Sequence, residues 1–132
     1  MSEQHLDLTA LIDRRDGRYH RQNLIPWWDQ SRLSDARLVV FGVGALGNEV
    51  LKLLALAGVG NILAYDMDKV EVSNLNRSIL FRRGDEGRYK VDVAKERIPE
   101  LNPDVRLHGH CANILHGVGL GVFLWADVLI GG

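Results

Sequence analysis

Short apolar runs alternate with longer amphipathic stretches along this chain. The apolar runs predict four strands, at residues 38–41, 61–65, 105–107 and 127–130. Residues 45–57 and 90–98 have the spacing of amphipathic helices, and Pro99 is expected to end or kink the second helix. Residues 111–125 are rich in glycine and predict a helix or an irregular crossover. Strands that alternate with helices indicate a parallel sheet with right-handed crossovers.

The helix predicted over residues 45–57 carries an apolar stripe. Its members recur at i, i+4, i+7, i+8 and i+11, and they are Leu46, Val50, Leu53, Leu54 and Ala57. The polar residues expected to face away from this stripe are Asn48, Glu49 and Lys52. The stripe is therefore predicted to face the sheet.

The N-terminal part has a different pattern. Residues 18–33 predict helical structure that Pro26 divides into two short helices, or a helix and a turn. Residues 1–17 are expected to form a flexible arm, and residues 18–132 a single domain. The predicted fold class is α/β, a Rossmann-like, doubly wound and mostly parallel sheet with an N-terminal helical arm. Ligand residues in such sheets follow the strand ends, so a chain that stops at Gly131-Gly132, directly after the last predicted strand, is expected to be truncated at its C-terminal side.

Composition limits the classes of function. The chain has 132 residues, of which 46% are hydrophobic and 25% charged, as in ordinary globular domains. A net charge of −1 gives no reason to expect nucleic acid or a membrane as a partner. A disulfide within the chain is excluded because Cys111 is the single cysteine, and it is expected to be a small buried hydrophobe. No signal peptide or membrane span is visible, so the expected location is cytoplasmic.

A glycine-rich segment joins the first predicted strand to the first helix. Its sequence is Gly42-Val43-Gly44-Ala45-Leu46-Gly47. The first glycine permits the tight turn, the second lets the backbone approach a phosphate, and the third lets the helix pack closely on the strand. Asp66 follows at the end of the next strand, 19 positions after Gly47, where a carboxylate can take ribose hydroxyls. The pattern predicts a nucleotide site; the alternatives are glycines that only allow packing and an aspartate that caps a turn.

A second motif is more specific. It runs Asp66-Met67-Asp68-Lys69-Val70-Glu71-Val72-Ser73-Asn74-Leu75-Asn76-Arg77, followed by Gly87-Arg88-Tyr89-Lys90 and preceded upstream by Arg18-Tyr19-His20-Arg21-Gln22. It resembles the activating-enzyme family, which comprises the adenylyltransferases that prime sulfur-carrier proteins and the E1 enzymes of ubiquitin-like proteins. Ser78 stands where that family usually has glutamine.

The resemblance implies a function. The family uses ATP and Mg²⁺ to adenylate the C-terminal carboxylate of a ubiquitin-like or sulfur-carrier protein. The implied nucleotide-binding residues are Gly42, Gly44, Ala45, Leu46, Gly47, Asp66, Asp68, Asn74, Arg77 and Lys90. The implied catalytic residues are Arg77, Lys90 and Arg21, and Arg21 would reach the ATP of a partner subunit, which implies a homodimer. The family's metal-binding aspartate is expected beyond residue 132.

Other interpretations stay open at this point. The same fold could act on a carboxylate of a tRNA base or a peptide, or form the non-catalytic half of a heterodimer. A dinucleotide oxidoreductase is a weaker alternative. Arg77 could pair with Asp85 or Glu86, and Asn74 could only stabilise a turn. Lys90 and Arg21 could be surface cations, although a cation at a helix start opposes the helix dipole.

Overall fold

A computed structural model of the chain describes residues 17–132. The predicted arm, residues 1–17, lies outside the described residues except for Gly17. The chain divides after Gln30 into two units, of which the second is Ser31–Gly132. In the first unit a 3-10 turn, η1 (Gln22–Leu24), precedes Pro26, and the next helix, α2 (Gln30–Asp35), begins at the last residue of this unit and belongs mainly to the second. The helical prediction over residues 18–33 thus becomes a turn and a short helix, as Pro26 suggested.

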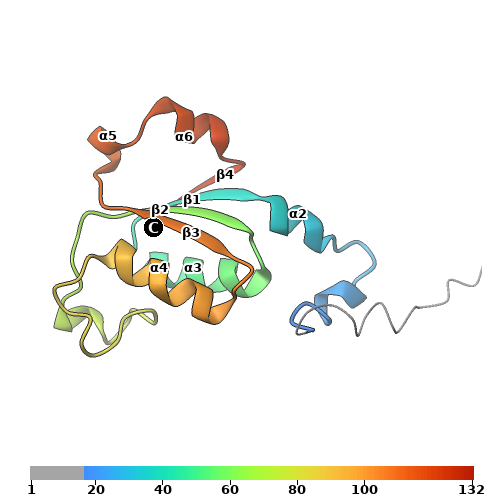
Figure 1. Cartoon of the computed structure of the whole chain (residues 1–132), viewed down its shortest axis with the longest axis horizontal. Helices are drawn as coiled ribbons and strands as arrows, with labels where there is room; N and C mark the ends of the chain where they lie inside the picture. Colours follow the sequence, from blue (N-terminus) through green and yellow to red (C-terminus); the bar gives the residue numbers. More distant parts are fainter. Residues whose placement is uncertain (1–16) are drawn as a thin grey trace, which may run out of the picture. The chain divides into compact units, whose positions relative to one another are not determined.

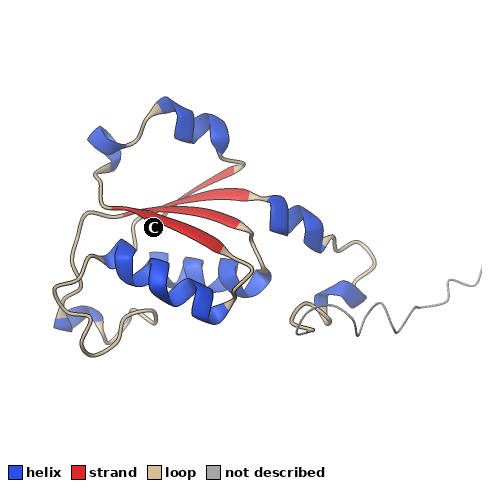
Figure 2. Ribbon diagram, viewed as in Figure 1, coloured by secondary structure: helices blue, strands red, loops and turns tan. Residues whose placement is uncertain are grey.

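The second unit is built on a four-stranded parallel sheet (Figure 2). Its strands are β1 (Arg37–Phe41), β2 (Asn61–Tyr65), β3 (Arg106–His110) and β4 (Val128–Gly131), in the order β3-β2-β1-β4. In the register, Phe41 lies beside Tyr65 and Tyr65 beside His110. The carboxyl ends of the strands therefore meet at one edge. This arrangement confirms the predicted Rossmann-like α/β fold.

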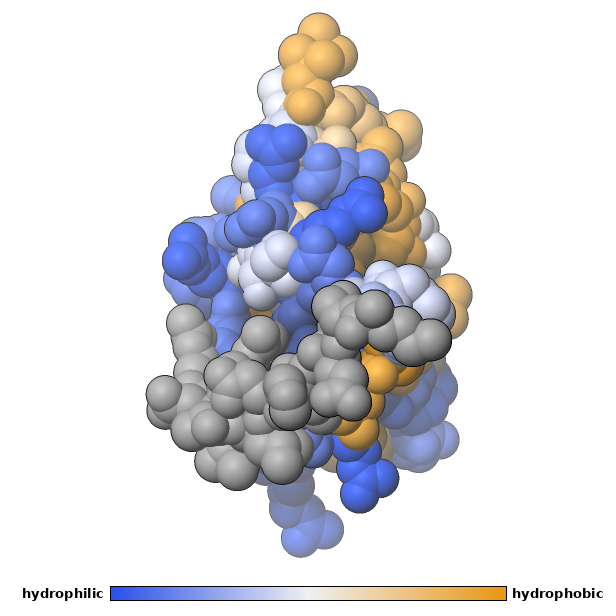
Figure 3. Space-filling view, turned by 90° about the vertical axis from the view of Figure 1, so that its right-hand side faces the viewer, coloured by the Kyte–Doolittle hydropathy of each residue, from blue (hydrophilic) through white to orange (hydrophobic). Residues whose placement is uncertain are grey.

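Helices lie on both sides of the sheet (Figure 1). On one side, α3 (Ala45–Ala57) and α4 (Lys90–Leu101) bury the main core against the sheet, with Val40, Leu51, Ile62, Val91 and Ile98 among its members. On the other side lie α5 (Ile114–Gly117) and α6 (Leu120–Trp125). The top of Figure 3, where Figure 1 places α6, is strongly hydrophobic, and Leu124 is 78% exposed. No helix in the described part of the chain is long and apolar enough to cross a membrane.

The predicted stripe of α3 is only partly correct, since Val50 and Leu54 pack against the core but two other members do not. The side chains of Leu46 and Leu53 are 61% and 60% exposed, and the buried positions are Gly47, Asn48, Leu51 and Ala55. Asn48 is buried because its amide Nδ2 donates to the carbonyl oxygens of Val43 and Gly44, at 3.0 and 2.9 Å, while its Oδ1 accepts from the N–H of Leu80 at 2.9 Å. A polar side chain with all these partners carries little burial penalty. Hydrophobicity alone therefore misplaced Leu46 and Leu53 and missed the burial of Asn48.

The helix α4 and the strand β3 both end three residues later than predicted. The helix α4 does not end before Pro99 but continues to Leu101, and the N–H of Asn102 donates to Ile98 O at 3.0 Å. A proline in the last turn removes one donor, and the turn can still close around it. The strand β3 extends to His110 rather than ending at Leu107, because every residue from 106 to 110 pairs with β2. The exposed side chains of Arg106, His108 and His110 are polar, so the strand lacks the continuous apolar run on which the prediction relied.

Candidate functional site

A cleft of about 490 Å³ opens at the carboxyl ends of the strands. It is lined by residues 41–42, 65–68, 112–114 and 131–132, which end or follow β1, β2, β3 and β4. Parallel α/β sheets bind ligands at this edge, and the volume suits a small molecule. The cleft contains three of the predicted site residues, namely Gly42, Asp66 and Asp68.

The glycine-rich turn has the geometry that its sequence predicts. Gly42 has φ +97°, which favours glycine, and its N–H donates to Tyr65 O at 2.8 Å. A Cβ at Gly47 would lie 2.8 Å from the carbonyl carbon of Gly42, so the absence of a side chain permits close helix packing. At Gly44 the space where a Cβ would stand is open. Gly44 is the N-cap of α3 and provides no side-chain cap, so Ala45 and Leu46 begin a helix whose first N–H groups suit an anion.

Asp66 joins the two motifs. Its Oδ2 accepts from the N–H of Val43 at 2.7 Å, and its Oδ1 accepts from the N–H of Asp68 at 2.7 Å. The carboxylate thus stabilises the glycine-rich turn while it lines the cleft. Each carboxylate oxygen can accept more than one hydrogen bond. The turn-capping interpretation of Asp66 therefore leaves acceptor capacity for a ligand.

Asn74 and Arg77, in the segment after β2, make different contacts. Asn74 ends the 3-10 turn η2 (Val72–Asn74), and its Oδ1 accepts from the N–H of Glu71 at 2.8 Å. Its side chain thus stabilises the turn. The Arg77 guanidinium donates to Ser73 O at 2.8 Å and lines a second hollow of about 370 Å³ with Glu49. Arg77 is exposed and does not line the strand-end cleft.

Lys90 begins α4 beside the cleft. Its backbone N–H donates to Asp68 O at 3.0 Å, which ties the start of α4 to the cleft wall. Lys90 is half-buried, and its ammonium group has no hydrogen-bond or ion-pair partner among residues 17–132. An uncompensated cation at a helix start is unfavourable unless an anion joins it. Arg21 belongs to the first unit, where it precedes η1 and is exposed.

Sequence reasoning did not identify part of the cleft wall. The rings of Phe41 and Tyr65 lie 5.6 Å apart and both residues line the cleft, and Tyr65 stacks on His110 at 5.0 Å. Burial raises the pKa of the Tyr65 phenol, which stays protonated at neutral pH. Residues 112–114 were not identified because β3 was predicted to end three residues early. Cys111, expected to be buried, is exposed next to this segment.

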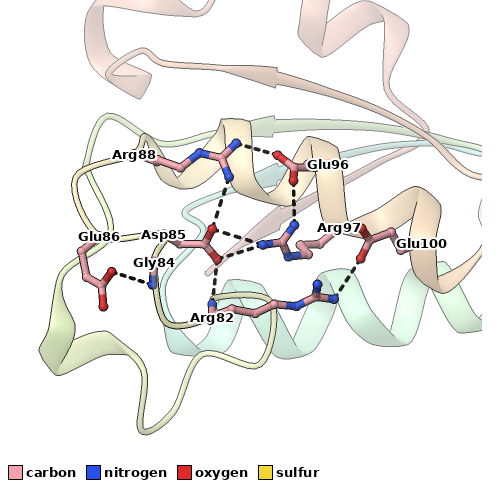
Figure 4. Close-up of polar contacts among 8 residues, drawn as sticks. All are labelled: Arg82, Gly84, Asp85, Glu86, Arg88, Glu96, Arg97 and Glu100. Carbon is pink, nitrogen blue, oxygen red and sulfur yellow. Dashed lines mark hydrogen bonds and ion pairs between the residues drawn. The ribbon is translucent and has the colours of Figure 1, made fainter.

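An ionic cluster centred on the buried Asp85 joins the loop between Arg77 and Lys90 to α4 (Figure 4). Asp85 is only 4% exposed and binds Arg88 and Arg97, so it is not a partner of Arg77. Burial opposes ionisation of Asp85, but the hydrogen bond from the Arg82 N–H and the charges of Arg97 and Arg88 outweigh it and lower the pKa of Asp85. The hydrogen bonds from Arg88 and Arg97 likewise lower the pKa of Glu96. These ion pairs therefore attach the loop to α4.

Comparison with known proteins gives consistent matches. Residues 18–130 match the ThiF family. The chain is 46% identical over 116 residues, or 86% of its length, to a sulfur carrier protein adenylyltransferase of Thermus thermophilus, of which it covers 43%. Among solved structures, it is similar to Escherichia coli MccB with ATP, with a TM-score of 0.73 and 32% identity over 81% of this chain and 35% of that one.

A second solved structure differs in its named substrate. It is the tRNA N6-threonylcarbamoyladenosine dehydratase TcdA of Escherichia coli, with a TM-score of 0.79 and 28% identity over 87% of this chain and 49% of that one. The chain spans less than half the length of each of these three proteins. The family match, over residues 18–130, includes the glycine-rich turn and Asp66.

Proposed function

This chain belongs to the ThiF family, and we propose that it forms the ATP-binding part of an adenylyltransferase that activates a carboxylate. One observation carries the proposal. The glycine-rich turn and the Asp66 carboxylate meet in a single cleft of about 490 Å³ at the strand ends, joined by the hydrogen bond from Val43. A helix N-terminus for phosphates and a carboxylate for ribose hydroxyls are the two groups that a nucleotide needs.

The proposed reaction transfers AMP. A carboxylate oxygen of the acceptor attacks the α-phosphorus of ATP, the bond to the bridging oxygen of the β-phosphate breaks, and pyrophosphate leaves with that electron pair. Such a step depends mainly on positioning and on neutralising charge. Lys90, whose ammonium lacks a partner among residues 17–132, and the exposed Arg77 are proposed to meet the charge that develops on pyrophosphate. Asn74 is proposed to contribute by keeping this segment in shape.

Magnesium is proposed to arrive with the ATP phosphates. Mg²⁺ is usually held by substrate phosphates with one or two carboxylates. The described residues contain no group of three His, Cys, Asp or Glu side chains that could hold a metal ion by themselves. Asp68 presents an exposed carboxylate at the cleft and is proposed to contribute to such a site. When bound, the metal would neutralise phosphate charge.

The proposed acceptor is the C-terminus of a sulfur-carrier or ubiquitin-like protein. It follows from the sulfur carrier protein adenylyltransferase that is 46% identical to this chain. A carboxylate on a modified tRNA base is the second candidate, because TcdA has the higher TM-score of the two structures. A peptide carboxylate is a third acceptor to include in the test.

The test is ATP–pyrophosphate exchange by the protein with each acceptor class. Exchange that depends on one acceptor identifies it, since radiolabelled pyrophosphate returns to ATP only when an acyl-adenylate forms and reverses. Failure to bind ATP at all would favour a non-catalytic scaffold. Binding of NADH in preference to ATP would indicate an oxidoreductase and refute the proposal.

Arg21 is proposed to act on the ATP of a second subunit in a homodimer. A guanidinium delivered by a partner could stabilise the departing pyrophosphate. The test mixes two inactive variants, Arg21→Ala and Lys90→Ala, after subunit exchange that mass spectrometry verifies. Recovery of part of the activity supports action between subunits, because one site per mixed dimer has both groups intact. If exchange occurs and no activity returns, Arg21 does not act on the partner's ATP.

A further inference from the structure

The loop that precedes Lys90 is attached to one face of α4 by an ionic network (Figure 4). Asp85 lies at its centre. Its Oδ1 accepts from Arg88 at 3.2 Å and from Arg97 at 3.1 Å, and its Oδ2 accepts from the Arg82 N–H at 2.7 Å. The Asp85 side chain is 5% exposed and that of Arg97 is 11% exposed, so this pair is held at a site with little water.

The network continues on α4. Glu96 binds Arg88 at 2.6 Å and Arg97 at 2.8 Å, while Glu100 binds Arg82 at 2.9 Å. Three cations and three anions therefore balance. The Arg97 Nε has no hydrogen-bond partner among the described residues, so Arg97 is oriented by the two carboxylates alone. Removal of Asp85 would leave both Arg88 and Arg97 with a single carboxylate, that of Glu96.

Backbone hydrogen bonds link this cluster to the cleft. The N–H of Val70 donates to Arg88 O at 2.8 Å, and the N–H of Gly87 donates to Val70 O at 2.9 Å. The N–H of Lys90 then donates to Asp68 O at 3.0 Å, while Lys69 and Tyr89 form an antiparallel bridge. Residues 68–70 and 87–90 thus form a short ladder, and Arg88 is common to the ladder and the cluster.

We propose that Asp85 is a positioning residue that, through Arg88, fixes this ladder and therefore the place of Lys90 beside the cleft. The contacts of Asp85 and Arg88 support the link from Asp85 to the ladder. The further effect on how Lys90 meets phosphates rests on the proposed function. Exposed ion pairs contribute little, but removing one partner of a buried pair leaves an uncompensated charge. Asp85 is the buried member of this network, and it is held from both the loop and α4.

The test compares variants of the protein with matched stability. Asp85→Asn leaves Arg97 unbalanced, so the double variant Asp85→Asn/Arg97→Met removes both members of the buried pair and should restore the melting temperature to near that of the wild type. Arg88→Gln is a second variant, since Arg88 is 40% exposed and Asp85 keeps Arg97. Glu100→Gln is the control, because it breaks an exposed pair of the same network.

Two readouts follow. In the double variant and in Arg88→Gln, hydrogen exchange at the amides of Val70, Gly87 and Lys90 should be at least about tenfold faster than in the wild type. The kcat of pyrophosphate exchange should fall about tenfold with little change in the KM of the acceptor. Glu100→Gln should change neither. The ladder readout needs no catalysis, so an inactive wild type would refute the proposed function without affecting this test.

Wild-type exchange rates at these three amides in a stability-matched variant would overturn the positioning role. Faster exchange with an unchanged kcat would overturn its catalytic part. A purely structural role predicts that activity returns together with the melting temperature.

Discussion

Alanine at Gly44 and alanine at Gly47 should separate ligand binding from stability. At Gly47 the new Cβ would overlap the carbonyl oxygen of Gly42, its nearest neighbour, and would lie 2.8 Å from the carbonyl carbon, where carbon atoms prefer about 3.5–4.0 Å. The backbone must therefore move by more than about 1 Å, at a cost of about 2–3 kcal/mol, the upper part of the range for overpacking. Alanine gains at most about 1 kcal/mol over glycine within a helix, so the clash wins.

At Gly44 an added methyl group meets no steric clash, so the effect on stability differs from that at Gly47. No atom lies within 4 Å of the place for a Cβ, and its φ of −82° suits any residue. Alanine is a poorer N-cap than glycine by about 1 kcal/mol, and the lower entropy of the unfolded chain offsets this by about 0.4–1 kcal/mol. Stability should hardly change. A phosphate at α3 would nevertheless meet the new methyl group, so ATP affinity should fall.

Urea unfolding and calorimetric titration with ATP measure the two effects. Gly47→Ala should lose about 1–2 kcal/mol of stability and lose ATP affinity as well. Gly44→Ala should lose affinity alone, by about tenfold or more for a steric conflict of this kind. ATP affinity that is unchanged in Gly44→Ala would refute the placement of the phosphates at this turn.

Further predictions concern single residues. Asn48→Ala should lower the free energy of unfolding by about 2–3 kcal/mol in urea, because the buried N–H of Leu80 loses its acceptor; a loss below 1 kcal/mol would count against that bond. Because folding lowers the pKa of Asp85 from 3.8, its stabilisation is complete above that pH and is lost as the pH falls through the folded value. Asp85→Asn should therefore flatten acid destabilisation below about pH 4 in urea titrations, and an equal slope in both proteins would disprove this. Cys111 is exposed beside Ala112 of the cleft, so bound ATP should slow its alkylation by iodoacetamide, measured by mass spectrometry, and an unaltered rate would contradict this.

Local sequence rules recovered the scaffold. The bounds of α3 and β2 agree with the prediction because a glycine turn starts the helix at Ala45 and strongly apolar residues form the strand. The cleft position of Asp66 also follows from parallel strands, whose carboxyl ends share one edge. These features depend on residues near one another in sequence or on a general property of the fold.

Contacts between residues that are far apart in the sequence could not be predicted from local patterns. Asn48 looked like an outward polar residue because its acceptor role for Leu80, 32 positions away, has no signature in the helix pattern. Asp85 appeared only as a possible partner of Arg77, since nothing local distinguishes it from Glu86. Asp85 differs from Glu86 in being buried, and it contacts Arg97, 12 positions further along the chain.

The role of Asp66 as a ribose ligand is the most direct test of the nucleotide site. Calorimetry should compare ATP with 2′,3′-dideoxy-ATP, which lacks both hydroxyls, in the wild type and in Asp66→Ala. The wild type should prefer ATP by about 1.5–3 kcal/mol, or about 10- to 150-fold, for charge-assisted hydrogen bonds. Asp66→Ala should bind both ligands equally, whatever the variant does to the glycine-rich turn. A preference for ATP that persists in Asp66→Ala would contradict the account.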